Sequence, residues 1–491
     1  MSQTFQFTTR HLGKKPENWG VGGMYIPPTP QFSANFHQYN DRVSWLYTLI
    51  TDPTGSRYFV EKSRETRLRE FKEQLARTAD FLAFAGNPQN QFRSIHIAGT
   101  SGKSSVVTIM AAILAQAGLR TGFHISPYLQ IPNEKLIIDG RMIPPSGFVQ
   151  LVDHFREKYD SWRTAGRPFD SLRYGEAWVA LTYLWFAMQQ VDWAVIETGV
   201  GGRYDPTNIL PSSLAVITNV DFDHVRILGS SLIDIARHKA GIIPQNGIVI
   251  TSETKPPALQ IIEEEAAQRN ARLYRIGRDF DFTIHAMNQD GTKLSIQTSC
   301  RQYNDIFLPM RGAFQPTNAA LSVAALDLLA AEYNLPLTPK AVKTALQNVQ
   351  FPGRMEIVQR NPTVILDGAH NPHKMRALAE SFRAIYPRQR VAVLFGMLVT
   401  KDAAARLRAL LHIASRFIFA KTDVFGKPPM PPAKLSDTLR SLAPDIPVQT
   451  LESPRQGIAL ALQTLAPDDT LLITGSIYFI GAVRDYWYPQ G

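Results

Sequence analysis

The chain of 491 residues is poor in cysteine and in long apolar runs. Its one cysteine, Cys300, excludes a disulfide within the chain and a cysteine-ligated metal cluster, and it fits a reducing compartment. No stretch approaches the roughly 20 apolar residues of a membrane-spanning helix, and the N-terminus lacks a charged-then-apolar signal pattern. We therefore expect a cytoplasmic protein with no membrane partner.

Basic runs interleaved with aromatic residues are also missing, although the formal net charge is +10 and the pI is near 9.5. Such runs are typical of nucleic-acid-binding surfaces. The positive charge therefore favours anionic small molecules over nucleic acid as ligands. Apolar residues are plentiful, at 44%, and the length predicts about two to four folded domains.

One short stretch carries the strongest local pattern. A predicted strand at 95–98 leads into Gly99–Ser105, which reads Gly-Thr-Ser-Gly-Lys-Ser-Ser, and an apolar helical run follows at 106–114. Strand, glycine loop and helix suit a phosphate group, because glycines turn backbone N–H groups toward an anion and Lys103 adds charge. The glycine spacing is two residues shorter than in the general phosphate loop, so this loop alone does not identify a phosphate-binding site.

Acidic and basic side chains follow two further buried-type strands. The strand at 191–197 ends at Glu197, and the strand at 214–220 precedes Asp223 and His224. Ligands gather at the carboxyl ends of strands in open α/β sheets, so Glu197 is placed like the metal-binding carboxylate that accompanies a phosphate loop. A lone histidine is more often structural than a ligand. By itself, Lys239 predicts only a charge on a helix surface.

Composition changes along the chain predict its domains. Residues 1–40 are polar, rich in glycine and proline, and without periodicity, which predicts an extended arm. Whether this arm is a disordered tail or packs on a partner stays open. Residues 41–352 then form a phosphate-loop domain that includes surface helices over 42–84 and an antiparallel meander over 279–309.

A second α/β pattern follows the Phe-Pro-Gly-Arg sequence at 351–354 and defines a domain over 353–491. Its predicted parallel strands alternate with helices. They lie at 363–371, 390–396, 416–420 and 470–476.

An ordered series of motifs runs from about Phe81 to the C-terminus and resembles the folylpolyglutamate synthase/dihydrofolate synthase branch of the Mur ligase superfamily. Each motif is modest alone, but their common order makes the resemblance specific. The motifs are Gly99–Ser105, Ser126–Leu129, Glu197–Arg203 with Thr207 and Asn208, Asp223 with His224, Lys239–Ile242, Gln315 with Asn318 and Ala319, Pro352–Arg354, Asp367–Pro372 and Gly475–Tyr478.

The resemblance implies a P-loop nucleotide-binding domain with a parallel sheet and small meander, a C-terminal Rossmann-like α/β domain, and an active site between them. It also implies an ATP- and Mg²⁺-dependent amide ligase that acts as a monomer. The γ-phosphoryl group of ATP would move to a folate-type carboxylate, and the amine of L-glutamate would attack the acyl phosphate. Phosphorylation supplies a good leaving group, while Mg²⁺ and cationic side chains offset negative charge.

The resemblance also assigns roles to residues. Lys239 matches a family lysine that is carbamylated, which would turn a cation into an anionic ligand. Either Ser104 or Ser105 could face the metal. The implied nucleotide contacts are Gly99, Thr100, Ser101, Gly102, Lys103, Ser104, Ser105, Gln315, Asn318, Arg354 and Asp367; the implied metal ligands are Ser104, Ser105, Ser126, Glu197, His224 and Lys239; the implied catalytic residues are Lys103, His224, Lys239, Arg354 and His370.

Several positions depart from the family pattern. Ser101 and Ser104 replace the usual asparagine and glycine of the loop, Tyr128 replaces a histidine, and Lys135 replaces an arginine. These positions flank the region where a pterin would bind. A folate ligase is the favoured hypothesis; a Mur-type ligase for a non-folate carboxylate and a non-catalytic nucleotide-binding protein are the alternatives.

Overall fold

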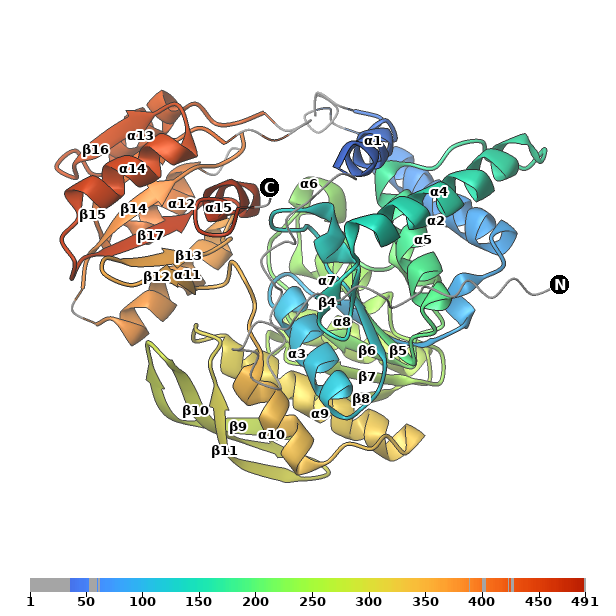
Figure 1. Ribbon diagram of the computed structural model, residues 1–491. Coiled ribbons are helices and arrows are strands. Elements are labelled where there is room, and N and C mark those ends of the chain that lie inside the picture. The colour runs from blue at the N-terminus through green and yellow to red at the C-terminus, as the bar shows by residue number, and fades with distance from the viewer. Residues whose placement is uncertain are drawn as a thin grey trace, which may run out of the picture.

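The computed structural model describes residues 36–52, 60, 62–387, 389–399, 403–422, 424 and 428–489. In this part of the chain the strands form an eight-stranded, a three-stranded and a six-stranded sheet, each accompanied by helices (Figure 1). The predicted α/β fold class is confirmed. None of the helices described is long and apolar enough to cross a bilayer.

The eight-stranded sheet has the order β4-β3-β2-β5-β1-β6-β7-β8, with parallel pairing from β2 to β8 and antiparallel pairing of β3 with both neighbours. Because β1 lies between β5 and β6, the segments that follow these three strands meet at one edge. The strands are β1 (Arg93–Ala98), β2 (Thr121–His124), β3 (Ile137–Ile138), β4 (Arg141–Met142), β5 (Trp193–Glu197), β6 (Leu214–Ile217), β7 (Ile248–Thr251) and β8 (Arg272–Arg275).

Helices cover both faces of this sheet. Alternate strand residues face opposite sides, so Ile95 and Val195 join a core with α3 and α9, whereas Ala194 and Ile196 pack against α4 and α5. The helix α3 is buried almost all round between the sheet and α9 with α10. The helices of this half are α2 (Arg64–Phe84), α3 (Lys103–Gln116), α4 (Pro145–Thr164), α5 (Tyr174–Met188), α6 (Val225–Leu228), α7 (Leu232–Ala240), α8 (Pro256–Gln268), α9 (Gln315–Tyr333) and α10 (Pro339–Asn348).

The first described helix, α1 (Phe36–Tyr47), begins inside the region predicted to be an extended arm. The helix forms here because Tyr39, Val43 and Leu46 share one face and pack on α4 and α5. The Tyr39 hydroxyl also donates a hydrogen bond to Asn133 Oδ1 over 2.7 Å. Residues 36–40 are therefore helical, and the remainder of the expected arm lies outside the described residues.

The predicted meander is present as the three-stranded antiparallel sheet of β9 (Phe280–Asn288), β10 (Gly291–Thr298) and β11 (Gln302–Leu308). It is attached to α9 through the carboxylate of Asp327, which accepts hydrogen bonds of 2.7 Å from Thr298 and from Tyr303. Figure 1 shows this sheet, in yellow-green, below the eight-stranded sheet.

The six-stranded sheet has the order β12-β13-β17-β14-β15-β16 and is parallel except at β12. Two of its strands, β12 and β16, lie at the edges and were not expected from the sequence. Its strands are β12 (Glu356–Gln359), β13 (Thr363–Leu366), β14 (Val391–Phe395), β15 (Ala414–Ala420), β16 (Val448–Leu451) and β17 (Thr470–Thr474), and its helices are α11 (Pro372–Ile385), α12 (Ala403–Leu410), α13 (Pro432–Leu442), α14 (Pro454–Thr464) and α15 (Ile477–Arg484).

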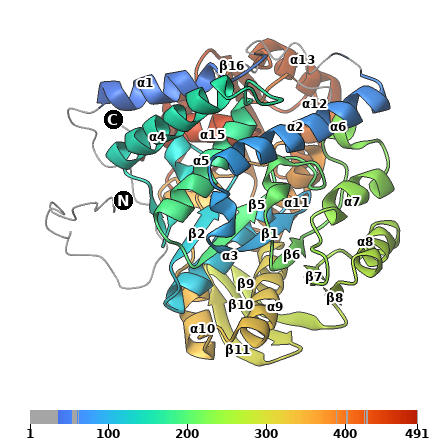
Figure 2. The same ribbon diagram turned by 90° about the vertical axis from the view of Figure 1, so that its right-hand side faces the viewer.

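The parts of the chain that contain the two large sheets lie next to each other (Figures 1 and 2), and α15 packs against the loop before β3. Gln130 Nε2 donates to the carbonyl of Tyr488 over 3.1 Å, and Arg484 contacts both Gln130 and the Glu356 carboxylate. A Cβ on Gly481 would lie 1.9 Å from the backbone oxygen of Leu129, in the loop before β3. Only glycine therefore allows this close approach of α15.

The buried ion pair between α2 and α5 provides a test of the packing. Arg77 binds Glu176 through two hydrogen bonds of 2.6 and 2.8 Å, and both side chains are nearly inaccessible. Replacing Arg77 by Leu leaves a buried, unpaired carboxylate and should cost about 3–5 kcal/mol of unfolding free energy. The measurement is urea denaturation followed by circular dichroism.

A matched control lies on the same helix. Arg69 faces Glu73 at 3.8 Å with 74% of its side chain exposed, so Arg69→Leu should change stability by less than about 0.5 kcal/mol. Equal effects of the two substitutions would contradict the structural role of the buried pair.

Candidate functional site

Residues from neighbouring segments pack closely against the loop between β1 and α3. A Cβ on Gly99 would lie 1.8 Å from Thr218 Oγ1, and a Cβ on Gly102 would lie 2.6 Å from Asn318 Oδ1. Gly102 also has a φ of +81°, a region that side chains disfavour. The end of β6 and the first turn of α9 therefore fix the loop.

Hydrogen bonds from the segment after β6 complete this support. The backbone N–H of Ser101 donates to Asn219 Oδ1 over 2.9 Å, and the Thr218 hydroxyl donates to the carbonyl of Ser101 over 2.6 Å. Thr100 likewise donates its N–H to the carbonyl of Asn219. Sequence analysis did not assign Thr218 or Asn219 to the site, although both end a predicted strand next to the loop.

Glu197, at the carboxyl end of β5, faces the same loop. The Ser104 hydroxyl donates to Glu197 Oε2 over 2.7 Å, and Lys103 Nζ lies 3.7 Å from Glu197 Oε1. The N–H of Ser126 lies 3.4 Å from the same carboxylate. Burial raises the pKa of Glu197, while Lys103 and Ser104 act in the opposite direction.

The structure distinguishes the two serines that follow the lysine. Ser104 points to Glu197, whereas Ser105 Oγ accepts a hydrogen bond from Gln315 Nε2 over 3.4 Å. Gln315 in turn accepts one from Asn318 Nδ2 over 2.9 Å. Ser105, Gln315 and Asn318 are thus joined in a buried network between α3 and α9.

The donors around the loop suit Mg²⁺, which prefers hard oxygen ligands and keeps several waters or phosphate oxygens. Ser104 and Glu197 supply such oxygens within hydrogen-bond distance of each other. Across the described residues no three His, Cys, Asp or Glu side chains form a complete metal cage. The oxygens of Ser104 and Glu197 are donors of the type that Mg²⁺ binds.

A second group of side chains follows β6 and lies on α7. Asp223 is half-buried, and interactions with His224 and Lys374 outweigh its burial and lower its pKa to about 2. His224 has a φ of +49°, and burial is the main cause that lowers the pKa of its imidazole. Lys239 is 3% exposed, and burial, followed by repulsion from Lys103, lowers its pKa well below the usual value.

The six-stranded sheet contributes Arg354, Asp367 and His370. Asp367 is buried at the end of β13 and accepts hydrogen bonds from the N–H groups of Ala369 and Met355 at 2.8 and 3.1 Å. A Cβ on Gly368 would lie 2.4 Å from Arg354 Nη1, so the guanidinium lies against this glycine. His370 Nδ1 lies 2.9 Å from the carbonyl of Gly368.

Two residues in the first turn of α11 were missed by sequence analysis. His373 Nδ1 lies 3.1 Å from Asp221 Oδ2, and Lys374 Nζ lies 4.0 Å from Asp223 Oδ2. These contacts join the six-stranded sheet to the loop that follows β6. The sequence contained one indication of their position. The predicted strand at 363–371 places the start of the following helix, and with it His373 and Lys374, at the carboxyl edge of the sheet.

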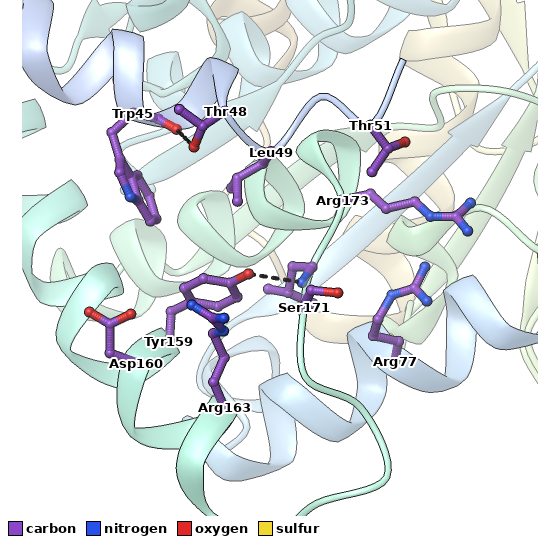
Figure 3. Close-up of a pocket in the computed structure, with 11 residues that line it drawn as sticks. Trp45, Thr48, Leu49, Thr51, Arg77, Tyr159, Asp160, Arg163, Ser171 and Arg173 are labelled. Atoms are coloured by element: carbon purple, nitrogen blue, oxygen red, sulfur yellow. Dashed lines mark hydrogen bonds between the residues drawn. The ribbon is translucent and has the colours of Figure 1, made fainter. Parts of the chain in front are cut away.

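A separate pocket lies away from these residues, among α1, α2, α4 and the segment before α5 (Figure 3). The pocket has a volume of about 430 Å³. Figure 3 shows Arg77, Arg163 and Arg173 around it, with the Tyr159 hydroxyl accepting the N–H of Leu172. None of the residues predicted to bind nucleotide or metal lines it.

Two family models match the chain. The Mur ligase middle domain matches residues 97–326, and the Mur ligase glutamate ligase domain matches residues 353–477. The fold and the loop thus define a Mur-type ligase, and the predicted enzyme class, an ATP-dependent ligase, is confirmed. Relatives named dihydrofolate synthase and folylpolyglutamate synthase are 31–33% identical over 84% of the chain, so within this superfamily it belongs to the folylpolyglutamate synthase/dihydrofolate synthase family.

Individual relatives cover most of the chain. It is 33% identical to the dihydrofolate synthase/folylpolyglutamate synthase of Bacillus subtilis, over 84% of this chain and 94% of the relative. It is 31% identical to the folylpolyglutamate synthase of Lacticaseibacillus casei, over 84% of this chain and 95% of the relative.

Solved structures show the same likeness. The Mycobacterium tuberculosis folylpolyglutamate synthase complexed with ADP has a TM-score of 0.80 at 27% identity, covering 92% of this chain and 99% of that chain. A folylpolyglutamate synthase complex with AMPPCP and folate has a TM-score of 0.75 at 28% identity, covering 91% of this chain and 99% of that chain.

The close approach of Asn318 to Gly102 can be tested against a glycine with similar backbone geometry. Gly102 has a φ of +81° and a neighbour at 2.6 Å, whereas Gly118, at the other end of α3, has a φ of +87° and no neighbour within 4 Å. Both alanine variants should lose about 1 kcal/mol of stability from the strained backbone.

Only Gly102→Ala should weaken the binding of ADP, by about tenfold or more, because the added methyl group displaces the loop from Asn318. The measurement is calorimetry in the presence of Mg²⁺. If Gly102→Ala bound ADP as tightly as Gly118→Ala does, this loop would not be the phosphate site.

Proposed function

We propose that this protein adds L-glutamate to a folate-type carboxylate, using ATP and Mg²⁺ and forming an acyl phosphate. The observation that carries the proposal is the convergence of Lys103, Ser104 and Glu197 at the phosphate loop, within 2.7 to 3.7 Å. Relatives named as folylpolyglutamate and dihydrofolate synthases support the choice of substrates.

On the ATP side, the backbone N–H groups of Gly99–Ser105 and the Lys103 ammonium would bind the phosphates. Ser104, Ser126, Glu197 and His224 would hold Mg²⁺, which when bound offsets the charge of the phosphates. Ser105, with Gln315 and Asn318, supports the loop from α9. The hydroxyl of Ser104, rather than that of Ser105, is thus the serine ligand we propose next to the lysine.

Lys239 has the properties of a lysine that reacts with carbon dioxide. Its burial and the nearby Lys103 favour the neutral amine, which is the reactive form. The amine nitrogen would bond to the carbon of CO₂ and lose a proton, which produces an anionic carbamate. Among the described residues no carboxylate lies within ion-pair distance of its ammonium, so a carbamate would not displace an existing partner.

The six-stranded sheet would supply the groups that face the reacting ends of the substrates. Arg354 would contact the nucleotide phosphates. Asp367, buried and braced by two N–H groups, would hold the segment that carries His370. Closure of the two sheets around the substrates would exclude water from the acyl phosphate.

The acceptor would bind near the aromatic residues around Tyr128. The Tyr47 and Tyr128 hydroxyls lie 2.9 Å apart, and Lys135 Nζ lies 4.8 Å from the centre of the Trp178 ring. Flat rings suit a pterin, and a cation suits the carboxylates of a folate-type substrate. Because Tyr128 and Lys135 are also the departures from the family pattern, a ligase for a non-folate carboxylate is the second candidate.

The organisation of the chain follows from the same proposal. The gap between the two matched families, between residues 326 and 353, supports a domain boundary between residues 352 and 353. We propose that the protein acts as a monomer. We place the enzyme in the cytoplasm, where ATP and reduced cofactors are available.

A substrate panel tests the proposed reaction. With Mg-ATP, the protein should release phosphate only when L-glutamate and a pteroate-type or folate acceptor are both present. Phosphate release measured with dihydropteroate, tetrahydrofolate and unrelated carboxylates separates the candidates. Turnover with other carboxylates and none with folates would establish the second candidate; no turnover with any would indicate nucleotide binding alone.

Substitutions of Lys239 test the carbamate. Lys239→Ala should lower kcat by about 100-fold or more, as expected for losing a charged group of the site. Lys239→Arg keeps the positive charge but cannot form the carbamate, so it should be equally inactive. Activity of Lys239→Arg near that of the wild type, with its melting temperature unchanged, would show that the assignment is wrong.

A further inference from the structure

Lys374 is a cation at the site that neither the motifs nor the proposed reaction has used. It lies in the first turn of α11, and its ammonium reaches the loop after β6, where Asp223 Oδ2 is 4.0 Å away. The side chain keeps 22% of its surface exposed. A ligand that binds between the two sheets can therefore touch it.

A hydrogen bond to His370 fixes the direction of this side chain. His370 Nδ1 lies 2.9 Å from the carbonyl of Gly368, which accepts but cannot donate, so Nδ1 carries the proton. Burial and the neighbouring Lys374 lower the pKa of His370 well below its usual value, which leaves Nε2 unprotonated. Nε2 then accepts a hydrogen bond from Lys374 Nζ over 3.1 Å.

Charged groups of both signs surround Lys374 near the phosphate loop. Burial lowers its pKa to about 8; Asp223 and Glu197 act against this shift, while Lys103 and Arg354 add to it. Cations from both sheets thus repel each other at one place. Like charges held together in this way are stabilised by a bound polyanion.

We propose that Lys374 is a catalytic residue whose ammonium contacts the terminal phosphate of ATP and stays with that phosphoryl group during transfer, with His370 as its positioning residue. This inference rests on the proposed function for the identity of the reaction. The bond between the γ-phosphorus and the bridging oxygen of ADP breaks, and a bond to a carboxylate oxygen of the acceptor forms. Lys374 exchanges no proton in this step.

Two nucleotides separate this role from a structural one. AMPPCP has the terminal phosphate and ADP lacks it, so binding of both with Mg²⁺ is measured by calorimetry for wild type and Lys374→Met. The variant should bind AMPPCP about tenfold or more weakly, while ADP affinity stays within about twofold. Its kcat should fall by about 100-fold.

Three further variants complete the experiment. Lys374→Arg keeps the charge and should retain AMPPCP affinity and most of kcat. Lys374→Gln, which keeps a polar side chain, repeats the test if Lys374→Met lowers the melting temperature. Lys434→Met replaces an exposed lysine on α13 of the same sheet and should change neither affinity nor kcat.

Several results would overturn the proposal. Equal weakening of ADP and AMPPCP would indicate a general structural role, and unchanged AMPPCP affinity would show that the phosphate is not contacted. Lys374→Arg with normal AMPPCP affinity but no turnover would make the lysine a proton acceptor instead. Wild-type protein that binds AMPPCP but turns over no folate would refute the substrate assignment and leave the phosphate contact standing.

A double-mutant cycle tests the part played by His370. His370→Ala should weaken AMPPCP binding in the wild-type background and should have no further effect in Lys374→Met, because the imidazole acts through the lysine. Additive losses in the double variant would show that His370 contacts the nucleotide independently.

Discussion

Repulsion among cations is the constraint on which this site depends. Lys103 comes from the phosphate loop, Arg354 from the junction before β12, and Lys374 from α11, and their charges act on one another. The carboxylates of Glu197 and Asp223 act against this repulsion. A bound polyanion would offset the charge of these cations, which come from both large sheets.

The sequence allowed most of the fold to be predicted, because buried parallel strands are continuous apolar runs. β5, β6, β14 and β17 all lie on such runs and are buried along their lengths. Two edge strands of the six-stranded sheet, β12 and β16, are only half-buried and contain polar residues. Their sequences therefore resemble loops, and only pairing with a neighbour identifies them.

The site was predicted where its residues form local patterns and missed where distant segments meet. Gly102, Lys103 and Glu197 are recognisable from a loop and a strand end. The contacts of Asp221 with His373 and of Asp223 with Lys374 join segments far apart in the chain. The choice between Ser104 and Ser105 likewise needed the orientation of α3 against α9, which no local pattern contains.

The packing of Thr218 and Asn318 against the two loop glycines has a consequence for synthesis of the protein. A nascent chain that has reached only α3 contains every residue of the loop but neither of these two neighbours. The support that Thr218, Asn219 and Asn318 give to the loop therefore forms only once β6 and α9 have been synthesised.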